Sequence, residues 1–280
     1  KGLPALREAV VDWVQRTEGL SYSPDNVLVG PGTKELMFLI QLVYYGDLVI
    51  PSPSWVSYAP QARIIGRHIH WLRTSPRNGL GVEPEALEEL CARDPNRPRL
   101  LILNTPSNPT GLAYTHEQLQ ALADVLRKYR VLALSDEIYS GTHFTGDHVS
   151  LARYYPEGTI ISNGLSKWCG AGGWRLGFFV FPDTLAWLAD AMAAVASETF
   201  TSTSAPLQYA AVSAFDERAD MQRYLDNSRR ILAGLADYAH RTLSEAGAQL
   251  HPAAGGFYLF PRFETHRDRL AARGIVDNGS

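Results

Sequence analysis

Residues 162–177 are the most informative stretch of this chain, and they read Ser-Asn-Gly-Leu-Ser-Lys-Trp-Cys-Gly-Ala-Gly-Gly-Trp-Arg-Leu-Gly. The stretch places Lys167 in a glycine-rich loop, with Arg175 eight residues later. Apolar runs at 159–161 and 178–181 predict a strand on either side. A lysine held between strands can lose its charge through burial or a cationic neighbour and then act as a nucleophile toward carbonyls. A surface lysine in a flexible loop explains this stretch alone equally well.

The composition is that of an ordinary globular protein. The 280 residues are 45% hydrophobic and 20% charged, which is enough for one large core with a smaller satellite. A net charge of -3 argues against binding to nucleic acid or to an anionic membrane. No apolar run approaches the ~18 residues of a membrane span. The two cysteines, Cys91 and Cys169, are too few for a disulfide framework or a zinc site, which favours a reduced, cytoplasmic setting.

Strands and helices alternate along the chain. Short apolar runs predict strands, and amphipathic helices lie between most of them. This alternation predicts an α/β fold with a mostly parallel, doubly wound sheet flanked by helices, together with part of a smaller α/β domain. The predicted strands of the first part are 26–29, 48–50, 68–72, 100–103 and 131–134.

Three segments are expected. Residues 1–20 form an N-terminal helix that leads into a large domain at 21–215. Residues 216–280 begin with one long helix and continue with a strand at 257–260 that belongs to a second, partial domain. The chain does not begin with methionine and stops in a polar stretch without a closing element, so we expect both ends to be missing.

Polar residues follow the carboxyl ends of the predicted strands, where open α/β sheets bind ligands. The turn Gly32-Thr33-Lys34 follows the first strand and presents backbone N–H groups and a hydroxyl to an anion. Asn108 and Asp136 follow two later strands. A buried carboxylate is costly unless it is paired, so Asp136 is expected to meet a cation. Plain turns and a solvated aspartate are the alternatives for each stretch alone.

Two histidines, His68 and His70, alternate along the predicted strand at 68–72. We expect both to face solvent rather than to bind a metal. No convincing set of further ligands accompanies them in the sequence, so no metal site is predicted.

Taken together, these motifs resemble those of the pyridoxal-phosphate (PLP) enzymes of fold type I, specifically the class I and II aminotransferases. The resemblance spans nearly the whole chain. It implies the large-domain fold of that family, PLP as the cofactor, and an active site at the interface of a homodimer, with the hydroxyl-rich segment 201–204 reaching the neighbour. The motifs that carry it are Gly32-Thr33, Asn104 to Gly111 with its Asn-Pro-Thr-Gly signature, Asp136 with Tyr139, and Ser166-Lys167 with Arg175.

The resemblance also implies a role for each residue. Lys167 would form the Schiff base with PLP and move protons between substrate and cofactor. Asp136 would keep the pyridine nitrogen protonated, while Tyr139 and Asn108 would hydrogen-bond the phenolate oxygen. The catalytic residues would thus be Lys167, Asp136 and Tyr139. The other expected cofactor contacts are the ring of Trp55 and a phosphate cup made of Gly32, Thr33, Lys34, Ser166 and Arg175.

Two departures from the family pattern limit the prediction. Gly164 stands where many relatives carry a phosphate-contacting serine, so Ser162 or Ser166 would replace that contact. No arginine before Ser280 matches the one that binds the substrate carboxylate, and Arg262 is interpreted as a surface or interdomain residue.

The predicted function is the transfer of an amino group between an L-amino acid and a 2-oxo acid. A PLP-dependent lyase or a cyclopropane-forming synthase on the same scaffold would use the same residues. An aminotransferase-like ligand-sensing domain of a transcription regulator would also bind PLP. The sequence does not name the substrate, because Trp55, Tyr58 and Trp174 fit an aromatic-tolerant pocket and ordinary core packing equally well.

Overall fold

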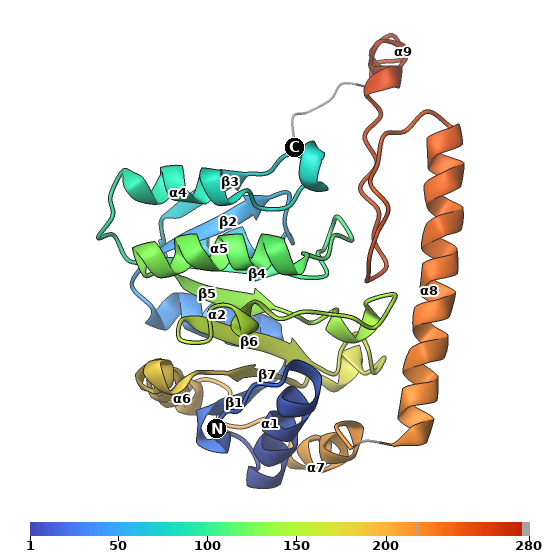
Figure 1. The fold of residues 1–280 in the computed structure, drawn as a ribbon. Helices are drawn as coiled ribbons and strands as arrows, with labels where there is room; N and C mark the ends of the chain where they lie inside the picture. The colour runs from blue at the N-terminus through green and yellow to red at the C-terminus, as the bar shows by residue number, and fades with distance from the viewer. Residues whose placement is uncertain (217, 276–280) are drawn as a thin grey trace.

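A seven-stranded sheet forms the centre of the computed structural model, which describes residues 1–216 and 218–275 (Figure 1). The strand order is β1-β7-β6-β5-β4-β2-β3. Neighbouring strands are parallel, except that β7 runs antiparallel to both β1 and β6. The predicted mostly parallel sheet is confirmed. The strands are β1 (Val27–Gly30), β2 (Asp47–Ser52), β3 (Ile69–Arg73), β4 (Arg99–Asn104), β5 (Leu132–Asp136), β6 (Thr159–Gly164) and β7 (Gly177–Val180).

Helices cover both faces of the sheet, because successive strand residues point to opposite sides. Ile102 packs on the face covered by α2, α3 and α6. Its neighbours Leu101 and Leu103 pack on the other face, against α4 and α5. Helices α1 and α7 continue that second face over β1, β6 and β7. The bounds are α1 (Pro4–Glu18), α2 (Thr33–Val43), α3 (Tyr58–Ile64), α4 (Pro84–Ala92), α5 (His116–Tyr129), α6 (Ala186–Glu198) and α7 (Ala205–Ala214).

Local signals in the sequence account for helix ends. A capping box starts α5: Thr115 Oγ1 accepts a hydrogen bond from the backbone N–H of Gln118, and Gln118 Oε1 accepts one from the N–H of Thr115. Each bond satisfies a donor that the first helical turn leaves without a partner.

The long helix predicted after residue 215 is α8 (Ala219–Glu245), 27 residues without a break. It stands to one side of the sheet and its covering helices (Figure 1). Arg229 fixes it there, since its Nε donates to the carbonyl of Gly141 at 3.0 Å. The short α9 (Arg267–Ala271) follows later. The division into segments at 20 and 215 stays a prediction, and residues 276–280 of the last segment lie outside the described residues.

The predicted strand at 257–260 is wrong. Pairing in this region is limited to isolated bridges between His143 and Gly255 and between Gln249 and Arg262. A strand needs a neighbour to receive its backbone hydrogen bonds, and within 1–216 and 218–275 no strand runs beside these residues. The segment instead turns toward the sheet domain, where the Tyr258 and Tyr139 hydroxyls lie 2.9 Å apart.

The structure also describes the cysteines and the apolar character of the helices. Both cysteines are free thiols. Of the helices in the described part of the chain, none has the length and apolar character needed to cross a membrane.

Candidate active site

A cavity of about 400 Å³ opens where the parallel strands end. The loops after β1, β2, β4, β5 and β6 all contribute to it, which places it at the edge of the sheet where α/β proteins bind ligands. Nine of the ten residues predicted to hold the cofactor line this cavity. They are Thr33, Lys34, Trp55, Asn108, Asp136, Tyr139, Ser166, Lys167 and Arg175.

Asp136, the last residue of β5, is 3% exposed and lies at the base of this cluster. Its Oδ2 accepts a hydrogen bond from the Tyr58 hydroxyl at 2.6 Å. Its Oδ1 is buried without a hydrogen-bond partner among the described residues. Burial raises the pKa of this carboxyl to about 6. The Tyr58 hydrogen bond opposes the rise, as do the nearby backbone N–H of Ile138 and hydroxyl of Ser162, although neither makes a hydrogen bond of ordinary geometry to Oδ1. A neutral hydroxyl therefore meets Asp136 where a cation was expected, and one carboxylate oxygen is left for a donor in the cavity.

Lys167 lies in the loop after β6 and is partly buried. Its Nζ is 5.5 Å from the centre of the Tyr139 ring and 5.7 Å from that of Phe257. These two rings contact each other with centres 5.4 Å apart, so the amine lies against one aromatic wall of the cavity. Burial and the contact with Tyr258 raise the pKa of Tyr139, so its hydroxyl stays protonated and can donate a hydrogen bond.

Asn104 connects two of the loops that build the cavity. It ends β4 and lies directly opposite Asp136 in the sheet. Its Nδ2 donates to the backbone carbonyl of Asp136 at 2.8 Å, and its Oδ1 accepts from the backbone N–H of Asn108 at 2.6 Å. The sequence places Asn104 at the start of the motif 104–111 but predicts no role for it, although its place at the end of a buried strand is a usable signal.

The turn before α2 and the loop after β6 meet at the other end of the cavity. Arg175 has a left-handed φ of 53°, and its Nη1 donates to the Gly172 carbonyl at 2.8 Å. A Cβ at Gly32 would lie 2.2 Å from Arg175 Nη2 and would displace the guanidinium, and the φ of 93° at Gly32 is one that other residues rarely adopt. Helix α2 begins at Thr33 with free N–H groups. A guanidinium beside a helix N-terminus can bind a phosphate.

The two serines considered for the phosphate contact differ in position. Ser166 lines the cavity. Ser162 is fully buried beside Asp136 in the register of β5 and β6, and it does not line the cavity. This geometry favours Ser166.

The three aromatic residues considered for the pocket differ in whether they line the cavity. Trp55 and Tyr58 line the cavity and their rings meet edge to face at 5.3 Å, whereas Trp174 is exposed outside it. Tyr258 lines the cavity as well and was not predicted, because it comes from a segment read as a distant strand. Arg262 is exposed and paired with Glu264, in agreement with its interpretation as a surface residue.

The residues present fit PLP. The unpaired Asp136 oxygen suits a protonated pyridine nitrogen, and the Trp55 ring suits the face of a planar heterocycle. Arg175 and the start of α2 suit a phosphate, and the amine of Lys167 lies among these groups. Each of these features alone is weak evidence for PLP binding, but this cavity contains all of them.

Known proteins are similar to this chain in both sequence and fold. The model of the family "Aminotransferase class I and II" matches residues 1–278. The aspartate aminotransferase of Geobacillus stearothermophilus is 35% identical over 268 residues, which are 93% of this chain and 66% of the relative. The aspartate/prephenate aminotransferase of Thermus thermophilus is 33% identical over 261 residues, 92% of this chain and 66% of the relative.

Solved structures agree with the sequence relatives. A tetra mutant of Thermus thermophilus aspartate aminotransferase superposes with a TM-score of 0.87 at 30% identity, covering 98% of this chain and 77% of that structure. The chain spans about two thirds (66%) of the length of the curated relatives it matches. On the family match, the sheet order and the contents of the cavity together, the chain belongs to the class I and II aminotransferases, a family of PLP-dependent enzymes.

Proposed function

We propose that the protein transfers an amino group between an L-amino acid and a 2-oxo acid with PLP bound at the cavity. The observation that carries this proposal is the unpaired Oδ1 of buried Asp136, which shares one cavity with Lys167 and Arg175. The relatives described above are all aminotransferases, and nothing in them favours a lyase, a cyclopropane-forming synthase or a ligand sensor.

Each residue of the cavity has a task in this proposal. PLP, when bound, supplies the electron sink that stabilises negative charge at the substrate α-carbon. Asp136 holds the proton on the pyridine nitrogen, and Tyr58 keeps that carboxylate oriented. Lys167 Nζ would hold the cofactor and would move the proton from the substrate α-carbon. Tyr139 and Asn108 donate hydrogen bonds to the ring oxygen.

The remaining contacts position the cofactor. Gly32, Thr33, Lys34, Ser166 and Arg175 bind its phosphate through backbone N–H groups, hydroxyls and a forked guanidinium. Trp55 covers one face of the ring. These contacts would hold the cofactor in one orientation beside the Lys167 amine.

Aspartate is the amino donor we propose to assay first, because the relatives described above carry it in their names. Product analysis separates the candidate reactions. An aminotransferase forms one 2-oxo acid and one new amino acid in equal amounts, whereas a lyase releases a fragment of the substrate without consuming an oxo acid. Release of such a fragment, with no new amino acid, would reject the proposal.

We also propose a cytoplasmic homodimer with a large domain at 21–215, a leading helix at 1–20 and a partial small domain from 216. Thr201 and Ser202 are exposed on the segment expected to reach the neighbouring subunit. Sedimentation of the full-length protein measures the assembly. A monomer that binds PLP at full affinity would contradict the dimer without affecting the proposed chemistry.

The direct test of the proposed function uses Lys167→Ala in the full-length protein. Wild type should show the visible absorbance of lysine-bound PLP and consume aspartate in the presence of a 2-oxo acid. The variant should lose both. An unchanged spectrum in the variant would exclude Lys167 as the residue that carries the cofactor.

A further inference from the structure

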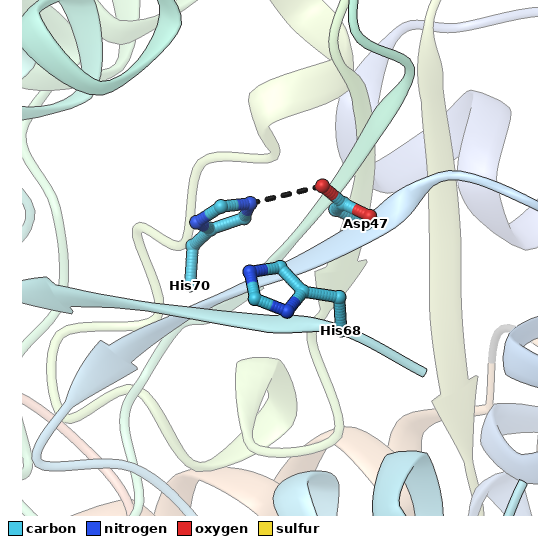
Figure 2. A group of neighbouring side chains, drawn as sticks. All are labelled: Asp47, His68 and His70. Atoms are coloured by element: carbon cyan, nitrogen blue, oxygen red, sulfur yellow. Dashed lines mark hydrogen bonds and ion pairs between the residues drawn. The ribbon is translucent and has the colours of Figure 1, made fainter. Parts of the chain in front are cut away.

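Three side chains with metal-binding atoms meet at the amino-terminal ends of β2 and β3, whereas the cofactor cavity lies at the carboxyl-terminal ends of the parallel strands. Asp47 begins β2, and His68 and His70 lie at the start of β3. The two strands are parallel with Leu48 beside Ile69, so Asp47 comes beside His68. Figure 2 shows the His70 ring joined to Asp47, with a ring nitrogen of His68 turned toward this pair.

The distances within this cluster are short. His70 Nε2 is 3.0 Å from Asp47 Oδ2, and the rings of His68 and His70 meet edge to face with centres 4.5 Å apart. One possible ligand atom from each of the three residues lies within 4.8 Å of the others. Sequence reasoning set the histidines aside because no third ligand accompanied them. The parallel register supplies it from 21 residues earlier, since Asp47 precedes His68 by that distance.

We propose that Asp47, His68 and His70 form a binding site for a divalent transition metal, with Zn²⁺ as the best match. Two imidazoles and one carboxylate are a ligand set that such ions accept, with a fourth position left to water. Tetrahedral zinc at about 2.0–2.2 Å from its ligands holds the ligand atoms about 3.3–3.6 Å from one another. The His70–Asp47 pair is already at 3.0 Å, so side-chain adjustment of the exposed His68 completes the site.

Arg97 is the competitor for this site. Its Nε donates to Asp47 Oδ2 at 2.9 Å and its Nη2 donates to Oδ1 at 2.8 Å. The Arg97 guanidinium and, to a smaller extent, His70 lower the pKa of Asp47 to about 2, although burial acts in the opposite direction, so the carboxylate is ionised. Half of the Arg97 side chain is exposed, which lets the guanidinium move toward solvent when a dication takes Oδ2.

The position of the site indicates what it does. Strand β3 is the outermost strand of the sheet, paired only with β2 in the described part of the chain. A metal held by Asp47 from β2 and by the two histidines of β3 would fasten this edge strand to the sheet. Because the cofactor cavity lies at the other ends of the strands, the metal would stabilise the fold without touching the reaction.

Titration calorimetry of the untagged, full-length holoenzyme with Zn²⁺ tests the proposal. Wild type should bind one ion per chain, and a Co²⁺-loaded sample should show the visible absorption of a four-coordinate ion. His68→Asn and His70→Asn should each weaken Zn²⁺ binding by at least about 10-fold. Loss of a residue that only hydrogen-bonds a metal ligand already costs about 10-fold or more, and loss of a ligand should cost at least as much. Arg97→Gln should tighten binding, because it removes the competing cation.

His251→Asn is the matched control, since His251 is exposed and lies outside the cluster. This variant should bind Zn²⁺ as wild type does, and Zn²⁺ should raise the unfolding temperature of both but not that of His68→Asn. PLP occupancy and circular dichroism verify that each variant is folded. Absence of stoichiometric binding in wild type, or equal affinity in wild type and His68→Asn, would overturn the proposal.

Discussion

Replacing Asp136 with asparagine should make the cofactor-free protein more stable at neutral pH. Burial raises the pKa of this carboxyl from an ordinary 3.8 to about 6. The folded state therefore holds the proton more tightly than the unfolded state, so stability falls as pH rises from about 4 to 6 and the whole cost remains at pH 7. The shift of 6 - 3.8 = 2.2 units, at about 1.36 kcal/mol per unit, corresponds to about 3 kcal/mol.

Urea unfolding of the apo proteins, followed by circular dichroism, measures this cost. Asp136→Asn should exceed wild type by up to about 3 kcal/mol at pH 7, and the gain should shrink below about 1 kcal/mol at pH 4, where the wild-type carboxyl is largely protonated. Asp12→Asn, at an exposed position of α1, is the control and should stay within about 0.5 kcal/mol of wild type at both pH values.

The same substitution should have the opposite effect on the loaded enzyme. A charge-assisted hydrogen bond contributes about 1.5–3 kcal/mol, so losing the carboxylate should weaken PLP binding about 10- to 150-fold and lower the rate. Stability and function would then oppose each other at one buried residue. An Asp136→Asn apo protein no more stable than wild type at pH 7 would refute the argument that burial of this carboxylate is costly.

Two further substitutions test the geometry around the cofactor. Tyr58→Phe removes the hydroxyl that donates to the buried carboxylate at 2.6 Å, which should raise the pKa of that carboxyl and weaken PLP binding about 10-fold or more in equilibrium dialysis. Tyr44→Phe, at a buried tyrosine of the same core, should leave the affinity unchanged, and equal effects of the two variants would contradict this role. Gly32→Ala would bring a Cβ within 2.2 Å of Arg175 Nη2, so it should weaken binding of PLP more than that of phosphate-free pyridoxal. Gly19→Ala shares the left-handed backbone but meets no atom within 4 Å, and should not discriminate between the two ligands.

Much of the fold follows from the sequence because its strands are short apolar runs with turn residues at both ends. Periodicity of 2 or 3.6 residues is a local property, and it predicted the parallel sheet and the long helix after residue 215. The strand at 257–260 was predicted wrongly because the prediction used local sequence alone. An apolar run after Gly255-Gly256 fits a strand locally, but a strand also requires a neighbour, and local sequence carries no information about one.

Some residues of the site also follow from local sequence, and others depend on contacts between distant parts of the chain. Lys167, Asp136 and Arg175 could be predicted because each follows a strand within a motif. Tyr58 as the donor to Asp136 could not, because a helix 78 residues away delivers it. The Asp47 cluster was missed for a related reason: its third member joins the histidines only through the pairing of two parallel strands.

Borohydride reduction of the full-length, PLP-loaded protein, followed by peptide mapping, identifies the lysine that is bonded to the cofactor. The sequence contains four lysines, Lys1, Lys34, Lys128 and Lys167. Lys1 and Lys128 are paired with carboxylates, and only Lys34 shares the cavity with Lys167. The account predicts that reduction fixes the cofactor to Lys167 alone. Label on Lys34, or no label on any lysine, would contradict it.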